Sequence, residues 1–103
     1  MSLEWIDNSS YSRGERGTVP PTTWTTRIGG DDPGAYSISI TCSHVMCRGV
    51  WVCHCPALRI DTEGLGMTKE EATAEQAQMA ALMLVRKRLE YMMAALISLW
   101  PGK

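Results

Sequence analysis

Apolar and polar residues alternate regularly in the first half of the chain. The clearest alternation runs from Tyr36 to Cys42, where every second residue is apolar and the residues between are serine or threonine. This period of two predicts a half-buried β-strand. Residues 22–28 and 50–55 are rich in β-branched and aromatic residues and predict two further strands. Together they predict an antiparallel β-meander over residues 22–61.

The segments around these strands carry weaker signals. Residues 1–21 mix scattered apolar side chains with glycine, serine and the pair Pro20-Pro21, which indicates an irregular arm with a short strand from Leu3 to Ile6. Residues 29–34 combine glycine, aspartate and proline and predict a hairpin loop. Residues 57–61 are predicted as a short edge segment, and the glycine-containing residues 63–67 as a loop.

A long helix is predicted after this loop. Thr68 and Glu71 have the spacing of a capping box, in which the threonine and glutamate side chains satisfy free backbone N–H groups at a helix start. No glycine or proline follows until Pro101, so one helix of about 30 residues, roughly 45 Å long, is predicted over residues 68–99. Residues 1–103 have the size of one domain. The predicted fold is α+β, a three- to four-stranded antiparallel β-meander followed by one long C-terminal helix packed on the sheet.

The end of this helix is too apolar for the sheet that precedes it. Strands of six to eight residues extend only about 20 to 26 Å, so about 15 Å of the helix is expected to overhang the sheet. Two alternatives follow. The arm folds back through Trp5, Ile6 and Tyr11 to cover the overhang, or the overhang binds a partner or a second copy in a symmetric homodimer, which we favour. The predicted binding residues are Leu89, Met92, Met93, Leu96, Ile97, Leu99 and Trp100.

Two rows of apolar residues run along the predicted helix. The first repeats at spacings of three and four, as in a heptad seam, and consists of Leu82, Val85, Leu89, Met92, Leu96 and Leu99. The second lies beside it and consists of Met79, Met83, Met93, Ile97 and Trp100.

Charge gives little reason to expect nucleic acid or a membrane as partner. The formal net charge is -1, and Glu70, Glu71 and Glu75 lie near the predicted helix start, where they would repel phosphates. Nucleic-acid binding is therefore not expected. Arg86, Lys87 and Arg88 form a short basic band, which we predict as a solvated helix face and retain as a candidate contact.

The same charges argue against a membrane span. The band, together with Glu90, interrupts the most apolar stretch, Met79 to Trp100, so this stretch is not expected to span a bilayer. No signal peptide is apparent at the amino terminus, which leads us to expect a cytoplasmic protein.

Cysteine and histidine cluster between positions 42 and 55. If Arg48 and Gly49 formed a two-residue hairpin loop, Cys42 would face Cys55 and His44 would face Cys53, which groups four metal-ligand side chains. The spacing lacks the paired C-x2-C arrangement of structural zinc sites, so no metal or other cofactor is expected. We favour the simpler interpretation that the cysteines continue the apolar strand face. A zinc site, a disulfide, and a nucleophilic cysteine paired with histidine remain alternatives. Asp31 and Asp32 are best explained as turn formers.

Two short stretches resemble known families. Residues 64–72, Gly-Leu-Gly-Met-Thr-Lys-Glu-Glu-Ala, resemble the strand-to-helix junction of double-stranded-RNA-binding domains, which implies a helix packed on a meander and an RNA partner. Residues 51–58, with Gly66, Thr68 and residues 70–72, are similar to the RNase H-like domain of HicB-type antitoxins. That second resemblance implies a protein that neutralises a partner toxin by binding it.

The whole layout, a short arm, a compact meander and one capped helix, resembles small accessory proteins of phages and prophages, anti-CRISPR proteins among them. This resemblance implies a non-enzymatic inhibitor that covers a functional surface of a host defence complex. The sequence shows no phosphate loop, nucleophile elbow or metalloprotease motif. We therefore predict a binding protein without catalytic residues. An antitoxin-like partner protein, a nucleic-acid-binding module and a small zinc-binding domain are the alternatives.

Overall fold

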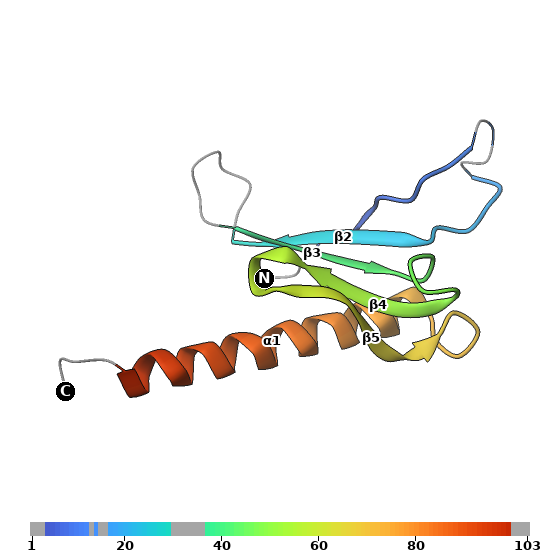
Figure 1. The fold of residues 1–103 in the computed structure, drawn as a ribbon. Helices are drawn as coiled ribbons and strands as arrows, with labels where there is room; N and C mark the ends of the chain where they lie inside the picture. Colours follow the sequence, from blue (N-terminus) through green and yellow to red (C-terminus); the bar gives the residue numbers. More distant parts are fainter. Residues whose placement is uncertain (1–3, 13, 15–16, 30–36, 100–103) are drawn as a thin grey trace.

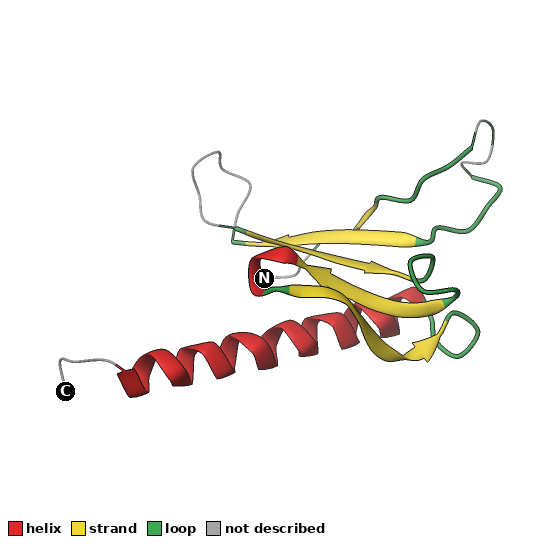
Figure 2. Cartoon of the chain, viewed as in Figure 1, coloured by secondary structure: helices red, strands yellow, loops and turns green. Residues whose placement is uncertain are grey.

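The computed structural model describes the chain except for residues 1–3, 13, 15–16, 30–36 and 100–103. One antiparallel sheet has the strand order β1-β2-β3-β4-β5, and a long helix lies along one of its faces (Figures 1 and 2). The elements are β1 (Ile6–Asp7), β2 (Thr23–Ile28), β3 (Ile38–Ser43), β4 (Val50–Cys55), the 3-10 helix η1 (Pro56–Leu58), β5 (Ile60–Thr68) and α1 (Ala74–Leu99). The α+β class and the meander followed by a helix are confirmed. Residues 30–34 of the predicted hairpin loop, Tyr36 and Leu3 lie outside the described residues.

The sheet has five strands where three to four were predicted, because segments at both ends of the meander pair with it. In the arm, Ile6 pairs with Thr25, and the Asn8 N–H donates to the Thr23 carbonyl at 2.9 Å. The Ser9 hydroxyl oxygen also accepts hydrogen bonds from the N–H groups of Thr22 and Thr23. Part of the arm is therefore the first strand of the sheet. The short strand predicted in the arm is present, but it lies at Ile6–Asp7 and not from Leu3 to Ile6.

The predicted loop at residues 63–67 is in fact the middle of β5. Glu63 and Gly64 pair with Cys53 and Val52 of β4, although the register shifts twice along this pair of strands. Gly66 has a φ of +78°, a left-handed conformation that glycine adopts readily. Glycine in a strand commonly marks such irregular pairing. The glycines at positions 64 and 66, which predicted a loop, therefore mark an edge strand with irregular pairing.

The helix begins six residues later than predicted. Thr68 is held in β5 by its pairing with Val50, and the chain makes one turn in which the Thr68 N–H donates to Glu71 Oε1 at 2.9 Å. The cap of α1 is Thr73. Its N–H donates to Gln76 Oε1 at 2.8 Å, and its hydroxyl accepts from the Gln76 N–H at 3.2 Å. Both Thr-x-x-Glu/Gln motifs occur in the sequence, and strand pairing decides which of them starts the helix.

Replacing the two threonines separately tests this assignment. Thr73→Ala removes the hydroxyl acceptor at the helix cap and is expected to lower the free energy of unfolding by about 1 kcal/mol. Thr68 contributes its backbone to the turn, so Thr68→Ala is expected to change stability by less than about 0.5 kcal/mol. Urea denaturation followed by circular dichroism measures both values. A larger loss of stability for Thr68→Ala than for Thr73→Ala would instead indicate that the helix begins at residue 68.

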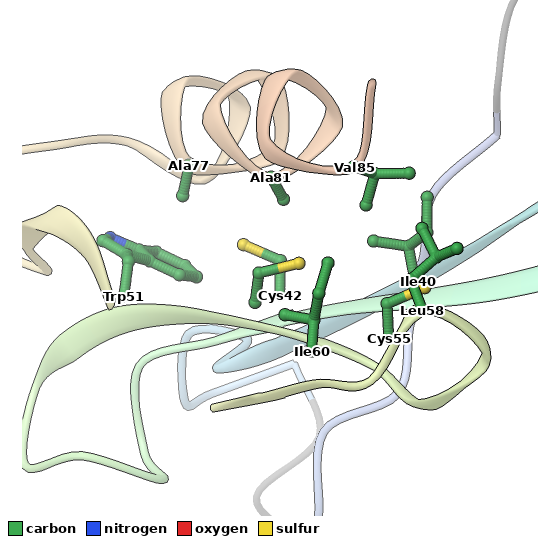
Figure 3. Packing of buried hydrophobic residues seen from close by; sticks show 10 residues of the cluster. Ile40, Cys42, Trp51, Cys55, Leu58, Ile60, Ala77, Ala81 and Val85 are labelled. Carbon is green, nitrogen blue, oxygen red and sulfur yellow. The ribbon is translucent and has the colours of Figure 1, made fainter. Parts of the chain in front are cut away.

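The core lies between α1 and the face of the sheet that it covers. Three residues one turn apart on α1, Ala77, Ala81 and Val85, are buried against β3, β4, η1 and β5 (Figure 3). The two alanines have small side chains, so the helix backbone lies close to the sheet. The buried sheet and η1 residues of this cluster are Ile40, Cys42, Trp51, Cys53, Cys55, Leu58 and Ile60.

The other face of the sheet is mainly polar between β2 and β3. Directly opposite residues pair there through hydroxyl groups, Thr23 with Ser43 at 3.0 Å and Thr25 with Thr41 at 3.2 Å. Alternation of apolar and hydroxyl side chains along these strands thus separates the two faces. α1 accordingly packs on the apolar face, and this fixes which side of α1 is left open.

Candidate protein-binding surface on the C-terminal helix

The second half of α1 extends beyond the sheet into solvent (Figure 1). Val85 is the last fully buried residue of the helix, and Arg88 is the last that is half-buried. Every residue from 89 to 99 is exposed, including Leu96 at 53% and Leu99 at 79%. The predicted overhang is therefore present.

The arm does not cover this overhang in the part of the chain that the structure describes. Trp5 packs against the core cluster, whereas Ile6 pairs with β2 and is 64% exposed. Tyr11 donates a hydrogen bond to Asp7 Oδ2 at 2.5 Å within the arm. Of the two alternatives that the sequence left open, the covering arm is thus ruled out for these residues.

The overhang exposes large apolar side chains on several sides of the helix, with Glu90 and Ser98 among them. Large patches of this kind are uncommon on monomeric soluble proteins and mark interaction sites. Six of the predicted binding residues lie on it, and Trp100 lies outside the described residues. Three further exposed side chains on α1 were not predicted as part of the site, although two of them belong to the second apolar row. They are Met79, Met83 and Tyr91.

The basic band does not form one patch. Successive residues of a helix point about 100° apart, so Arg86, Lys87 and Arg88 face different directions. Arg86 forms an ion pair with Glu90 at 3.1 Å. Arg88 turns toward the sheet, where its guanidinium donates to the Leu58 carbonyl and to Glu63, both at 3.3 Å. Both arginines are thus engaged within the chain.

The cysteine and histidine residues are arranged differently from the predicted ligand group. The β3–β4 connection spans residues 44–49 instead of two residues, which shifts the register so that Cys42 faces Cys53. His44 lies in this connection, with its ring edge-on to Trp51 at a centroid distance of 4.7 Å. The four predicted ligands therefore do not converge. Among the described residues no three His, Cys, Asp or Glu side chains are grouped to hold a metal ion.

The three buried thiols are part of the core, as the packing interpretation predicted. Burial, and to a lesser extent a neighbouring cysteine, raises the pKa of both Cys42 and Cys53 to about 12. Burial also raises the pKa of Cys55. These groups are therefore neutral thiols at physiological pH, and all four cysteines are free. His54, beside Cys55 in sequence, belongs to the other face, with Nδ1 3.3 Å from Asp61 Oδ1.

Thiol reactivity is expected to follow this burial. With a thiol reagent such as DTNB at pH 8, one thiol per native chain should react within minutes, and this thiol should be the half-buried Cys47. The other three thiols should react only after denaturation. Cys47→Ser should leave no rapidly reacting thiol. Rapid reaction of two or more native thiols would contradict the buried arrangement.

The buried thiols also predict how stability depends on pH. Because folding raises the pKa of Cys42 and Cys53, the stability that depends on their neutral form is complete below about pH 8.5 and declines as pH rises toward 12.

No protein-family model matches the chain, and comparisons with curated proteins and with solved structures find no match to it. The described residues contain no helix with the length and apolar character needed to cross a membrane.

Proposed function

We propose that this protein is a non-enzymatic protein-binding module whose binding surface is the exposed apolar end of α1. The observation that carries the proposal is the exposure of residues 89–99, where large apolar side chains follow one another on a helix that no described segment covers. An amphipathic or apolar helix presented in this way is a common means of docking into a groove on another protein. We also propose that the chain forms a homodimer through α1.

The finer proposal is an inhibitor of the phage-encoded, anti-CRISPR type, which acts in the host cytoplasm by covering a functional surface of a defence complex. Its support is the layout of a single small domain with a projecting apolar helix. The buried thiols and the intramolecular pairing of Arg86 and Arg88 favour neither cysteine chemistry nor a phosphate-binding patch. Both observations agree with a protein that acts by occupying a surface.

An affinity capture tests the proposal. Wild type, Leu96→Glu and Glu75→Gln are immobilised separately and exposed to lysate of the native host, and retained proteins are identified by mass spectrometry. A component of a defence complex is expected on wild type and on Glu75→Gln, which alters an exposed residue in the first turn of α1, outside the apolar end. Leu96→Glu should lose it, because the buried contact would desolvate a charge.

Equal retention by Leu96→Glu would contradict the assigned surface. Retention of a small toxin or of RNA in place of a defence complex would replace the inhibitor with an antitoxin-like protein or a nucleic-acid-binding module.

A further inference from the structure

Six exposed residues of α1 form a row on the side of the helix that faces away from the sheet. At about 100° per residue, they fall within about 80° of one another and about 160° from the buried line of Ala77, Ala81 and Val85. Their four apolar members are each more than half exposed. We call these six residues the back row, which consists of Met79, Met83, Arg86, Glu90, Met93 and Ile97.

No described element covers the back row. Figure 1 shows α1 on one face of the sheet, with the opposite side of the middle and C-terminal parts of the helix open. The row includes residues on both halves of α1, the half packed on the sheet and the overhang. Met79 and Met83 belong to the half of α1 that packs on the sheet, yet they are 60% and 56% exposed. The exposed apolar surface of this helix therefore extends beyond the overhang.

The back row has a symmetric spacing. Its members are separated by four, three, four, three and four positions, so the row reads the same in both directions about the midpoint between Arg86 and Glu90. A two-fold axis through that midpoint sets Met79 against Ile97 of the partner subunit and Met83 against Met93 of the partner subunit. It also sets Arg86 against Glu90 of the partner subunit. Each apolar residue then meets an apolar residue, and each charge meets its opposite.

We propose that a second copy of this chain occupies the back row, with the two α1 helices antiparallel and centred between Arg86 and Glu90. The proposal rests on the self-association through α1 proposed above, and it names the residues, orientation and register of that contact. A self-complementary patch of this kind is what a two-fold symmetric homodimer requires. Half of the residues in the back row are methionine, whose flexible side chain adapts its shape readily in such contacts.

Charge decides between the two helix orientations. In a parallel pair Arg86 would face Arg86 of the partner subunit at the same height, and Glu90 would likewise face its own counterpart. In the antiparallel pair each arginine is level with a glutamate, and the Arg86–Glu90 ion pairs of the two chains form one cluster at the axis. Such charges fix orientation and register more than they add affinity.

The proposed dimer covers Met93 and Ile97 but leaves the rest of the partner-binding surface open. Because the back row is opposite the sheet, the two sheets lie outermost and the two helices form the inner layers. Met92, Leu96 and Leu99 are about 100° or more around the helix from the centre of the back row, so they remain exposed. The contact from Met79 to Ile97 is about 27 Å long, a small interface for which micromolar affinity is expected.

A charge-pairing experiment tests the register. Met83→Glu and Met93→Lys each place a charge against an apolar residue, whereas the double variant places the new carboxylate of one subunit against the new ammonium group of the other, at two symmetric positions. Sedimentation equilibrium at about 1 to 100 µM should show a wild-type dimer. Each single variant should dissociate about tenfold or more readily, and the double variant should recover most of that loss. Tyr91→Lys, on another side of α1, should dimerise like wild type.

The outcomes separate this inference from the proposed function. Circular dichroism and thermal unfolding should show all variants folded, because both methionines are exposed in the single chain. If the wild type is monomeric at 100 µM, the inference and the proposed self-association both fail. If the wild type is dimeric but the single variants are unaffected, the back row is wrong while self-association through another part of α1 stands. Loss without recovery in the double variant would overturn the antiparallel register.

Discussion

A glutamate at Val85 is expected to destabilise the domain strongly, whereas the same substitution at Leu96 should leave its stability nearly unchanged. Val85 is 1% exposed, and its side chain lies between α1 and the sheet, where a carboxylate would be buried without a partner. Burying such a charge costs several kcal/mol, a large part of the about 5 to 15 kcal/mol that stabilises a typical domain. Leu96 is 53% exposed, so a charge there stays hydrated.

The two variants form a matched pair on one helix. Urea denaturation monitored by tryptophan fluorescence and circular dichroism should give a loss of about 3 kcal/mol or more for Val85→Glu. For Leu96→Glu the change should be within about 0.5 kcal/mol, measured at concentrations where wild type and variant have the same oligomeric state. Unfolding of a monomeric Leu96→Glu would show that the helix end belongs to the domain's own core and would remove the basis of the binding surface.

Removing the Trp51 side chain is expected to have a comparable effect on stability. Trp51 is 3% exposed and joins three parts of the fold, because its ring lies in the core, contacts His44 edge-on, and donates from Nε1 to the Ala72 carbonyl at 3.4 Å. Trp51→Ala should lower the free energy of unfolding by about 3 to 5 kcal/mol through the lost burial and the cavity left behind. Thermal and urea unfolding measure this loss.

Trp51→Phe is the matched control for this prediction. Phenylalanine keeps an aromatic ring in the core and lacks the indole N–H, so the loss should be clearly smaller than for alanine. A loss below about 1 kcal/mol for Trp51→Ala would contradict the position of Trp51 in the core. Equal losses for the two variants would instead give the main role to the hydrogen bond with Ala72.

The sequence by itself determined the elements whose signals are local. The alternation of apolar and hydroxyl residues predicted β3 and the apolar face that holds Cys42, and the run without glycine or proline predicted one long helix. The mismatch between this helix and the short strands also predicted the overhang with Leu96 and Leu99. Period and length are properties of neighbouring residues, so they can be recognised without knowing the fold.

The tertiary structure decided every feature that depends on pairing between distant segments. Pairing with β4 made residues 63–67 part of β5 and held Thr68 in the sheet, which moved the helix start to Thr73 and Ala74. The longer β3–β4 connection changed the partner of Cys42 and took His44 away from the cysteines.

The open side of α1 also depended on tertiary packing. The spacing of the back row is present in the sequence, but its exposure follows from which line of α1 packs on the sheet. Two rows of similar apolar character run along this helix, and hydrophobicity alone does not choose between them. The small side chains of Ala77 and Ala81 allow close approach on one side only, and this leaves Met79 and Met83 in solvent.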